Sequence, residues 1–282
     1  MLFAGAIAAV ALRAHALNRG GAIAAFVVGT LTFASGTVGF TLVLLAFFVP
    51  SVILSRVGKA RKRELTDIGK GGARDALQVL ANGGVATACA IVWAFTHDIH
   101  WAVAFAGAYA ASTADTWATE IGTLAPSPPR SILTWRPLPT GMSGGVTARG
   151  TWAELAGALW IGVVAPPAMV VAYVFGSFEF GWLTGYDNAI GILALALAIF
   201  GAAIFVAGVA GATVDSLIGA TLQELRRCDV CDRTCETNPH TCGNPTHLVR
   251  GLPGITNDAV NFAATLTGAL IAPLVYSLLA AL

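Results

Sequence analysis

Long apolar segments alternate with short polar links along the whole chain. Runs of this length and continuity are typical of helices that cross about 30 Å of hydrocarbon, and not of the short alternating strands of a membrane barrel. The first two runs are short for that thickness, so we expect them to tilt or to pack inside the bundle. The predicted segments are approximately 2–12, 20–34, 37–55, 76–96, 101–124, 151–175, 188–221 and 257–281.

The composition supports this pattern. The chain is 56% hydrophobic and 11% charged, whereas soluble domains carry about 25% charged residues. Its 32 glycines suit close packing of helices in lipid. The start of the chain has neither a basic region nor a small-residue cleavage site, so we interpret it as a first membrane helix. We predict an all-α, polytopic helix bundle of about eight transmembrane helices, with 1–282 as one domain.

Positive charge is sorted to alternate links. All 16 lysines and arginines lie in the links 13–20, 56–75, 125–150 and 222–256. The intervening links contain none: a tight turn expected near Ser35–Gly36, the turn at His97–His100, and 176–187 with Glu179 and Asp187. Cytoplasmic loops carry the excess of Lys and Arg, so we predict that both termini lie outside. The lack of an organellar targeting segment indicates a prokaryotic inner membrane.

Residues 111–122 place carboxylates in an apolar run. A carboxylate at membrane depth is costly and by default indicates a functional site, and Asp115 fits that reading best. Glu120 has an alternative, because Gly122 and Pro126 could end the helix in water. The two side chains are about 140° apart on an ideal helix. They therefore have separate roles unless the helix unwinds near Gly122.

A similar motif recurs in the seventh segment. Asp215 and Ser216 follow Gly-Ala-Thr-Val, as Asp115 and Thr116 follow Ala-Ser-Thr-Ala. The two segments run in the same direction, so the two Asp side chains could face each other. The eighth segment begins with Asn257, Asp258 and Asn261. Hard oxygen ligands of this kind suit Mg²⁺ bound together with substrate phosphates.

Two further stretches at the predicted cytoplasmic face could bind phosphate. One is a helix face with Arg74, Gln78 and Asn82, for which an interhelical hydrogen-bond seam is an equal alternative. The other is the glycine-rich stretch 140–151, whose backbone N–H groups could surround an anion. Its alternative is a flexible loop with Thr151 as a helix N-cap. The residues of this stretch that we assign to binding are Thr140, Gly141, Ser143, Gly144, Gly145 and Thr147.

Four of the five cysteines lie in the 222–256 link. Cys-x-x-Cys followed by His-x-Cys is zinc-binding spacing, and Cys228, Cys231, His240 and Cys242 are the best four ligands. Cys235 or His247 could replace one of them. We predict a structural zinc ion, because four strong ligands leave no open position for catalysis. Cys89 is expected to be a packing residue, and His97 and His100 are expected at the opposite surface.

Together these motifs resemble a membrane protein family that includes plant phytyl-phosphate kinase and vertebrate transmembrane protein nineteen. The likeness spans nearly the whole chain from about residue 20. It is carried by Gly72-Ala-Arg74 to Gln78, Asn82-Gly83, Ala114 to Gly122, Thr140-Gly141, Ser143 to Thr147, Gly150, Asp215-Ser216, Gly219 to Gln223, Asn257-Asp258 and Asn261.

The resemblance implies distant kinship with phytol kinase, dolichol kinase and CDP-diacylglycerol synthase. It implies a CTP-type kinase that converts an isoprenyl monophosphate, phytyl or geranylgeranyl phosphate, to the diphosphate. Asp115, Asp215 and Asp258 would then hold Mg²⁺ and nucleotide phosphates, and Glu120 would join or tune that site. Ser216, Asn257 and Asn261 would contact substrate or nucleotide. The resemblance carries over no residue between Arg226 and Gly251.

Two other functions use the same features. A cytidylyltransferase that forms a CDP-lipid differs only in which phosphorus is attacked. A transporter of an anionic lipid would have its site near the bilayer midplane, open to both sides. The partners we expect are a membrane lipid substrate and a nucleoside triphosphate, CTP or ATP. No nucleic acid is expected, and the sequence is compatible with a homo-oligomer.

Overall fold

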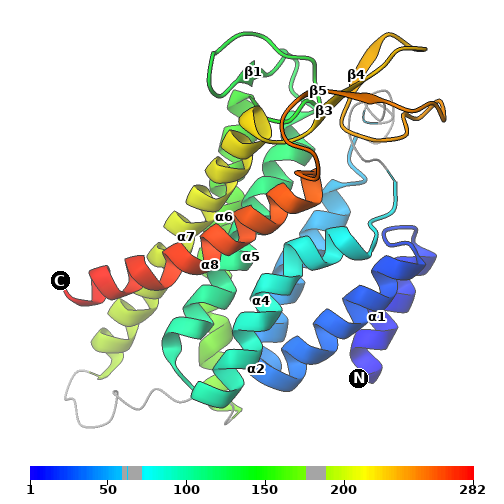
Figure 1. The fold of residues 1–282 in the computed structure, drawn as a ribbon. Coiled ribbons are helices and arrows are strands. Elements are labelled where there is room, and N and C mark those ends of the chain that lie inside the picture. Colours follow the sequence, from blue (N-terminus) through cyan, green and yellow to red (C-terminus); the bar gives the residue numbers. More distant parts are fainter. Residues whose placement is uncertain (59–61, 63–71, 176–188) are drawn as a thin grey trace.

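The chain forms a helical bundle with small β-sheets at one end (Figure 1). The computed structural model describes all residues except 59–61, 63–71 and 176–188, so Gly69–Gly71, Glu179 and Asp187 lie outside the described residues. Among these described residues, four helices are long and apolar enough to cross a membrane: Ala76–Thr96, Ala148–Val174, Ile190–Thr221 and Asn257–Ala280. The helices are α1 (Leu2–Arg13), α2 (Arg19–Leu54), α4 (Ala76–Thr96), α5 (Ile99–Gly122), α6 (Ala148–Val174), α7 (Ala189–Thr221) and α8 (Asn257–Ala280).

Helix α2 folds back on itself. It is continuous over 36 residues, and a straight helix of that length would separate its ends by about 54 Å. Both ends instead meet the link between α1 and α2. The backbone N–H of Asn18, the N-cap, donates to Arg74 O, and Arg56 Nη2, just beyond the other end, donates to Ala14 O at 3.2 Å. The reversal lies near Gly36, where an added Cβ would be 2.6 Å from Phe40 Cβ. The predicted segments 20–34 and 37–55 are therefore the two arms of one bent helix.

Helix α5 is the centre of the bundle. Every residue from Ala102 to Ala114 is buried, and α2, α4, α6, α7 and α8 all contact this helix. Small side chains allow these close approaches, as expected for helices in lipid. At Gly107 an added Cβ would lie 2.5 Å from the Gly268 carbonyl oxygen of α8. The polar end of α5 is thus held rigidly among its neighbours.

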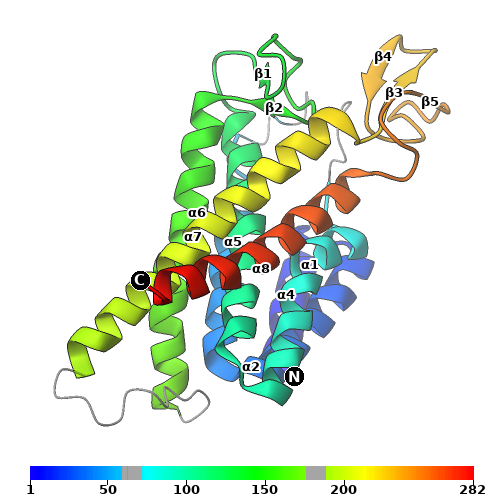
Figure 2. The same ribbon diagram turned by 60° about the vertical axis from the view of Figure 1, so that its left-hand side comes forward.

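The described parts of the positively charged links lie together at one end of the bundle. The backbone of the 13–20 link is hydrogen-bonded to Arg74, and Ser143 in the 125–150 link contacts Glu236 in the 222–256 link. Figure 2 shows both small sheets above this same end. The common placement agrees with the sorting of charge along the chain.

The all-α prediction omitted short strands within these links. β1 (Arg130–Ser131) pairs with β2 (Gly145–Val146). β3 (Leu225–Cys228) is the middle strand between β4 (Arg233–Cys235) and β5 (His247–Arg250), and both pairings are antiparallel. Strands of two to four residues leave little periodic pattern in a sequence.

Candidate active site

A polar cavity of about 310 Å³ opens at the positively charged end of the bundle. Its size is at the lower end of the range of ligand pockets. Helices α4, α5, α6, α7 and α8 contribute to its walls, together with the glycine-rich link. The predicted site residues that line the cavity are Arg74, Gln78, Asn82, Asp115, Glu120, Thr140, Gly141, Ser143, Gly144, Gly145, Thr147, Asp215, Ser216, Asn257 and Asn261.

Asp258 is the predicted site residue that is not among those lining the cavity. It lies in the first turn of α8, between Asn257 and Asn261, which both line it. Adjacent positions on a helix point in different directions. The beginning of α8 therefore presents amide side chains to the cavity.

The carboxyl groups of Asp115, from α5, and Asp215, from α7, face each other in the wall of the cavity. The two side chains are within hydrogen-bonding reach, as the repeated motif predicted. Asp215 Oδ2 is buried and makes no hydrogen bond to any described residue. Two carboxylates at this separation cannot both stay charged without a proton or a cation between them. The pair therefore offers the hard, anionic oxygens that Mg²⁺ prefers.

A third carboxylate, Glu154, lies beside this pair. It comes from the second turn of α6 and lines the same cavity. Its side chain is within hydrogen-bonding reach of Thr213 and close enough to Asp115 for their charges to interact. The sequence contained a signal for it, because Glu154 is an acidic residue within a predicted membrane segment, which indicates function by default. Glu154 was not among the predicted site residues.

Glu120 has a separate partner. Helix α5 continues to Gly122 without unwinding, and Glu120 Oε2 forms an ion pair with Lys62 Nζ at 2.5 Å. Lys62 also donates to Leu54 O at 2.9 Å, which anchors it to the end of α2. Glu120 and Asp115 therefore have different environments, although both line the cavity.

The predicted stripe on α4 has two kinds of members. Gln78 forms a capping box with Asp75, and Asn82 accepts a hydrogen bond of 2.6 Å from Ser112 of α5. The Asn82 bond joins two helices and agrees with the interhelical-seam alternative, whereas the Gln78 bonds cap the start of α4 itself. Arg74 differs. It lies before α4, which begins at Ala76, so it is not on the helix face that the sequence predicted. Its guanidinium makes no hydrogen bond or ion pair with another described residue. Burial lowers the pKa of Arg74, and the nearby charge of Glu120 partly opposes that change.

The glycine-rich link approaches α7 closely. Gly144 has φ +77°, and an added Cβ would lie 2.5 Å from Ala220 Cα. Helix α6 begins at Ala148 with Thr147 as its N-cap, whose Oγ1 accepts from Gly150 N at 3.0 Å. The N-cap is therefore Thr147 and not Thr151. The link is a defined structure that brings backbone N–H groups and a helix N-terminus to the cavity.

We expect Gly144→Ala to destabilise the protein by about 1–3 kcal/mol, because it adds both a backbone clash and a left-handed strain. The matched control is Gly84→Ala in α4, where an added Cβ would meet only Leu80 Cβ at 4.0 Å. That control should be neutral or stabilising by up to about 1 kcal/mol. Thermal unfolding in detergent measures both. Equal melting temperatures for the two variants would contradict the close approach of link and α7.

Glu236 reaches the cavity from the Cys/His link. It directly follows β4 and accepts hydrogen bonds from the backbone N–H and the Oγ of Ser143, both at 2.9 Å. Gln223 Nε2 also donates to it, at 2.8 Å. Burial raises the pKa of Glu236, and the bonds from Ser143 oppose that rise. No motif in the sequence identified this residue, because its contact depends on the fold of the link.

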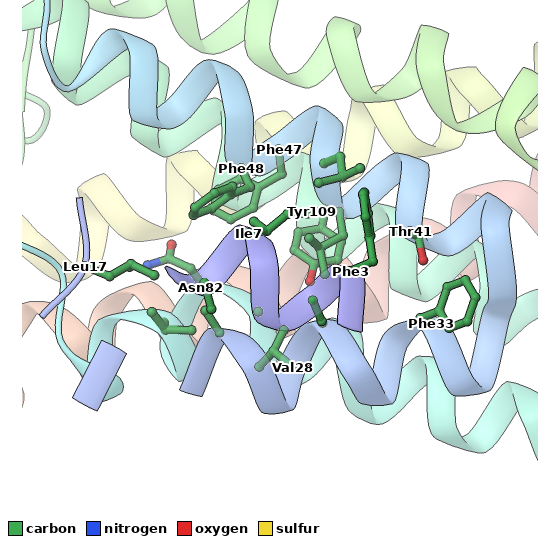
Figure 3. Close-up of a pocket in the computed structure, with 18 of the residues that line it drawn as sticks. Phe3, Ile7, Leu17, Val28, Phe33, Thr41, Phe47, Phe48, Asn82 and Tyr109 are labelled. Atoms are coloured by element: carbon green, nitrogen blue, oxygen red, sulfur yellow. The ribbon is translucent and has the colours of Figure 1, made fainter. Parts of the chain in front are cut away.

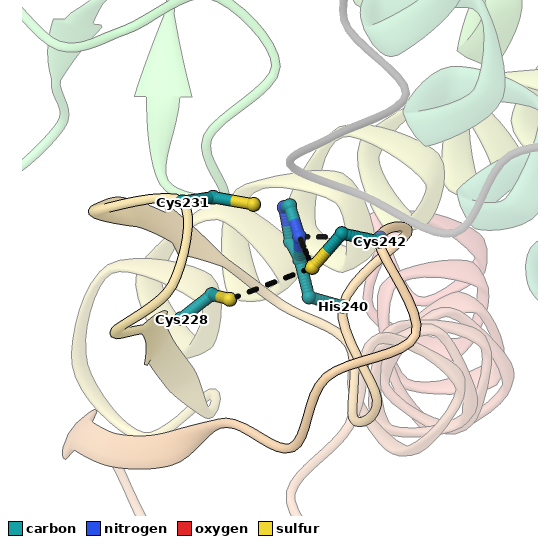
Figure 4. A group of neighbouring side chains, drawn as sticks. All are labelled: Cys228, Cys231, His240 and Cys242. Carbon is teal, nitrogen blue, oxygen red and sulfur yellow. Dashed lines mark hydrogen bonds between the residues drawn. The ribbon is translucent and has the colours of Figure 1, made fainter.

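The predicted zinc ligands lie together in the same link (Figure 4). One ligand atom from each of Cys228, Cys231, His240 and Cys242 lies within 4.8 Å of the others. Cys228 Sγ and Cys242 Sγ are 3.7 Å apart, close to the separation of about 3.8 Å expected for two thiolates on one tetrahedral zinc. Hydrogen bonds from Asn244 and His240 lower the pKa of Cys242 to about 6, which favours the thiolate that binds metal.

The two substitutes considered above have other contacts. Cys235 Sγ donates to Thr237 O at 3.4 Å, and His247 Nδ1 lies 3.3 Å from Asp229. Neither belongs to the group of four. Cys89 is buried in the core within α4, as expected. At the opposite end of the bundle His97 is exposed, and His100 is half-buried with its Nδ1 2.7 Å from Asp98 Oδ1.

Residues 2–269 match the family described as "Integral membrane protein DUF92". The chain is similar to "Protein PGR" of Arabidopsis thaliana, with 30% identity over 269 residues that cover 89% of this chain and 85% of that protein. It is 28% identical to "Uncharacterized membrane protein MJ0933" of Methanocaldococcus jannaschii, covering 94% of this chain and 87% of that protein. "Uncharacterized membrane protein sll0875" of Synechocystis is 29% identical, covering 71% and 69%. No solved structure matches the chain.

Proposed function

The chain belongs to the DUF92 family of integral membrane proteins, and from this premise we propose that it is a lipid-phosphate kinase. It transfers a phosphoryl group from a nucleoside triphosphate, CTP or ATP, to an isoprenyl monophosphate such as phytyl or geranylgeranyl phosphate. The observation that supports this most directly is the single cavity in which paired carboxyls, an arginine and a glycine-rich link meet. Phosphoryl transfer requires these elements, because it depends on positioning and charge neutralisation.

The proposal includes a membrane topology. Eight spans, with α2 counted as two, place both termini outside and the positively charged links in the cytoplasm. The cavity then opens to the cytoplasm of a prokaryotic inner membrane, where nucleotides are available. Its position at the bundle end, and not at the midplane, favours an enzyme over a transporter.

Asp115 and Asp215 are the proposed ligands of Mg²⁺, with Glu154 beside them. The metal would neutralise the nucleotide phosphates and the charge that develops during transfer. Arg74 binds the phosphate of the lipid, and the N–H groups of the glycine-rich link hold the nucleotide phosphates. Helix α8 begins beside this site with Asn257, Asp258 and Asn261. The amide side chains of Asn257 and Asn261 contact the substrates.

The Cys/His group is proposed to hold a structural zinc ion. Its four ligands leave no open position, so the metal does not take part in transfer. A zinc ion held by these residues would fix the β3–β4 hairpin, which is directly followed by Glu236 at the cavity. In this way a metal site in the link supports the shape of the phosphate-binding region.

Turnover of purified protein in detergent tests the proposal. With Mg²⁺, CTP or ATP, and geranylgeranyl monophosphate, we expect the lipid diphosphate and the nucleoside diphosphate in equal amounts. Release of pyrophosphate with a CDP-lipid would instead identify a cytidylyltransferase. Movement of the lipid phosphate across the membrane of protein-containing vesicles, without nucleotide turnover, would instead identify a transporter and contradict the proposed enzyme activity.

A further inference from the structure

A second cavity lies between α1, both arms of α2, α4 and α5 (Figure 3). Its walls are almost entirely aliphatic and aromatic, with contributions such as Ile7, Val28 and Phe47. Phe3, which also lines it, is 61% exposed, so the cavity is bordered by apolar side chains that face the membrane. The function proposed above does not use this cavity.

The apolar cavity joins the polar cavity end to end. Arg74, Gln78 and Asn82 line both of them. Figure 3 shows Asn82 and Leu17 at one end of the apolar cavity, and Phe33 and Thr41 at the other. A single ligand can therefore have a polar group at Arg74 and an apolar chain that extends away from it.

The cavity is long enough for a lipid chain. Its lining includes Leu17, just before α2, and Phe33 within the first arm of α2. From Arg19, where α2 begins, to Phe33 the helix rises by about 21 Å. One leaflet of the hydrocarbon core is about 15 Å thick, half of the whole. The residues that line the cavity thus span more than the length that one lipid chain occupies in a leaflet, around a free space of about 110 Å³.

The positive charge of Arg74 determines which lipid head group can bind where the two cavities join. The guanidinium of Arg74 is a partly buried cation without a hydrogen bond to another described residue, and a guanidinium there can bind a phosphate through two parallel hydrogen bonds. We infer that this cavity binds the hydrocarbon chain of a single-chain lipid monophosphate, with its phosphate at Arg74 facing the carboxylate cavity. The inference rests on the proposed function only for the choice of a lipid phosphate as ligand.

Equilibrium binding of radiolabelled geranylgeranyl monophosphate in detergent, without nucleotide, tests this site independently of turnover. Gly29 lines the apolar cavity about 16 Å along α2 from its start, and an added Cβ would meet only Ala4 Cβ at 3.5 Å. Gly29→Phe should therefore fill the middle of the cavity. We expect it to weaken binding of geranylgeranyl monophosphate by about tenfold or more, and binding of geranyl monophosphate by less than about twofold.

Gly84→Phe is the matched control, because Gly84 lines neither cavity and an added Cβ there would meet only Leu80 Cβ, at 4.0 Å. It should bind both lipids as the unmodified protein does. Arg74→Gln should weaken the binding of geranylgeranyl monophosphate but not the binding of geranylgeraniol, which has no phosphate. Unchanged binding in a folded Gly29→Phe protein, or equal losses for the long and short chains, would overturn the assignment. Binding that depends on chain length, in a protein that shows no turnover, would support this lipid site and would contradict the proposed kinase activity.

Discussion

Asp115→Asn should reduce turnover by about 10²-fold or more, because it removes one of two carboxylates that face each other in the cavity. The amide keeps the size of the side chain but loses the negative charge that binds Mg²⁺. The loss should appear in kcat, because charge neutralisation matters most in the transition state. Initial rates of diphosphate formation over a range of Mg²⁺ concentrations measure it.

Asp98→Asn is the matched control on the same helix. Asp98 is the N-cap of α5 and accepts from His100 N at 2.9 Å. It lies at the opposite end of α5 from the cavity. Asn caps a helix about as well as Asp, so turnover should be unchanged. Full activity in Asp115→Asn, or equal loss in both variants, would exclude the carboxyl pair as the metal site.

Cys228→Ser should remove bound zinc from the purified protein. Loss of a direct ligand should lower the affinity for zinc by more than the roughly 10–100-fold that follows when a residue hydrogen-bonded to a ligand is lost. The β3–β4 hairpin would then lose its anchor, and Glu236 would leave Ser143. We expect a lower zinc content by elemental analysis and a reduced kcat. The membrane helices should retain their helical circular dichroism, because the link packs outside the bundle.

Cys235→Ser distinguishes the four predicted ligands from their alternatives. Cys235 lies in the same hairpin, and its sulfur contacts Thr237 O instead of the group of four. A serine hydroxyl can make the same bond, so zinc content should stay at about one per chain, the occupancy of a closed structural site. Zinc loss in this variant, with retention in Cys228→Ser, would reassign the ligand set.

The sequence predicted the features that repeat or that contrast with their surroundings. Helix α4 has the predicted bounds, 76–96, because apolar residues fill it and polar links flank it. The shared motif on two segments of the same direction indicated that Asp115 and Asp215 could face each other, and their side chains do so. Charge sorting predicted that the four basic links meet at one end.

The features that were not predicted depend on tertiary contacts. Glu236 reaches the cavity only because the 222–256 link folds over Ser143. Lys62 pairs with Glu120 across 58 positions in the chain, and no local pattern encodes that pairing. Gln78 and Asn82 looked like phosphate ligands from their spacing, yet capping and interhelical bonds engage them. Spacing identifies a shared helix face but not the partner that the face meets.

The burial of α5 has a consequence for how the protein enters the membrane. This helix is not among the four that are long and apolar enough to cross a membrane alone, since it carries Ser112, Thr113 and Asp115. Polar groups of this kind are costly in lipid unless neighbouring helices bond to them. During biogenesis α5 should therefore leave the translocon together with α4, whose Asn82 accepts the Ser112 hydroxyl, and not as an independent segment.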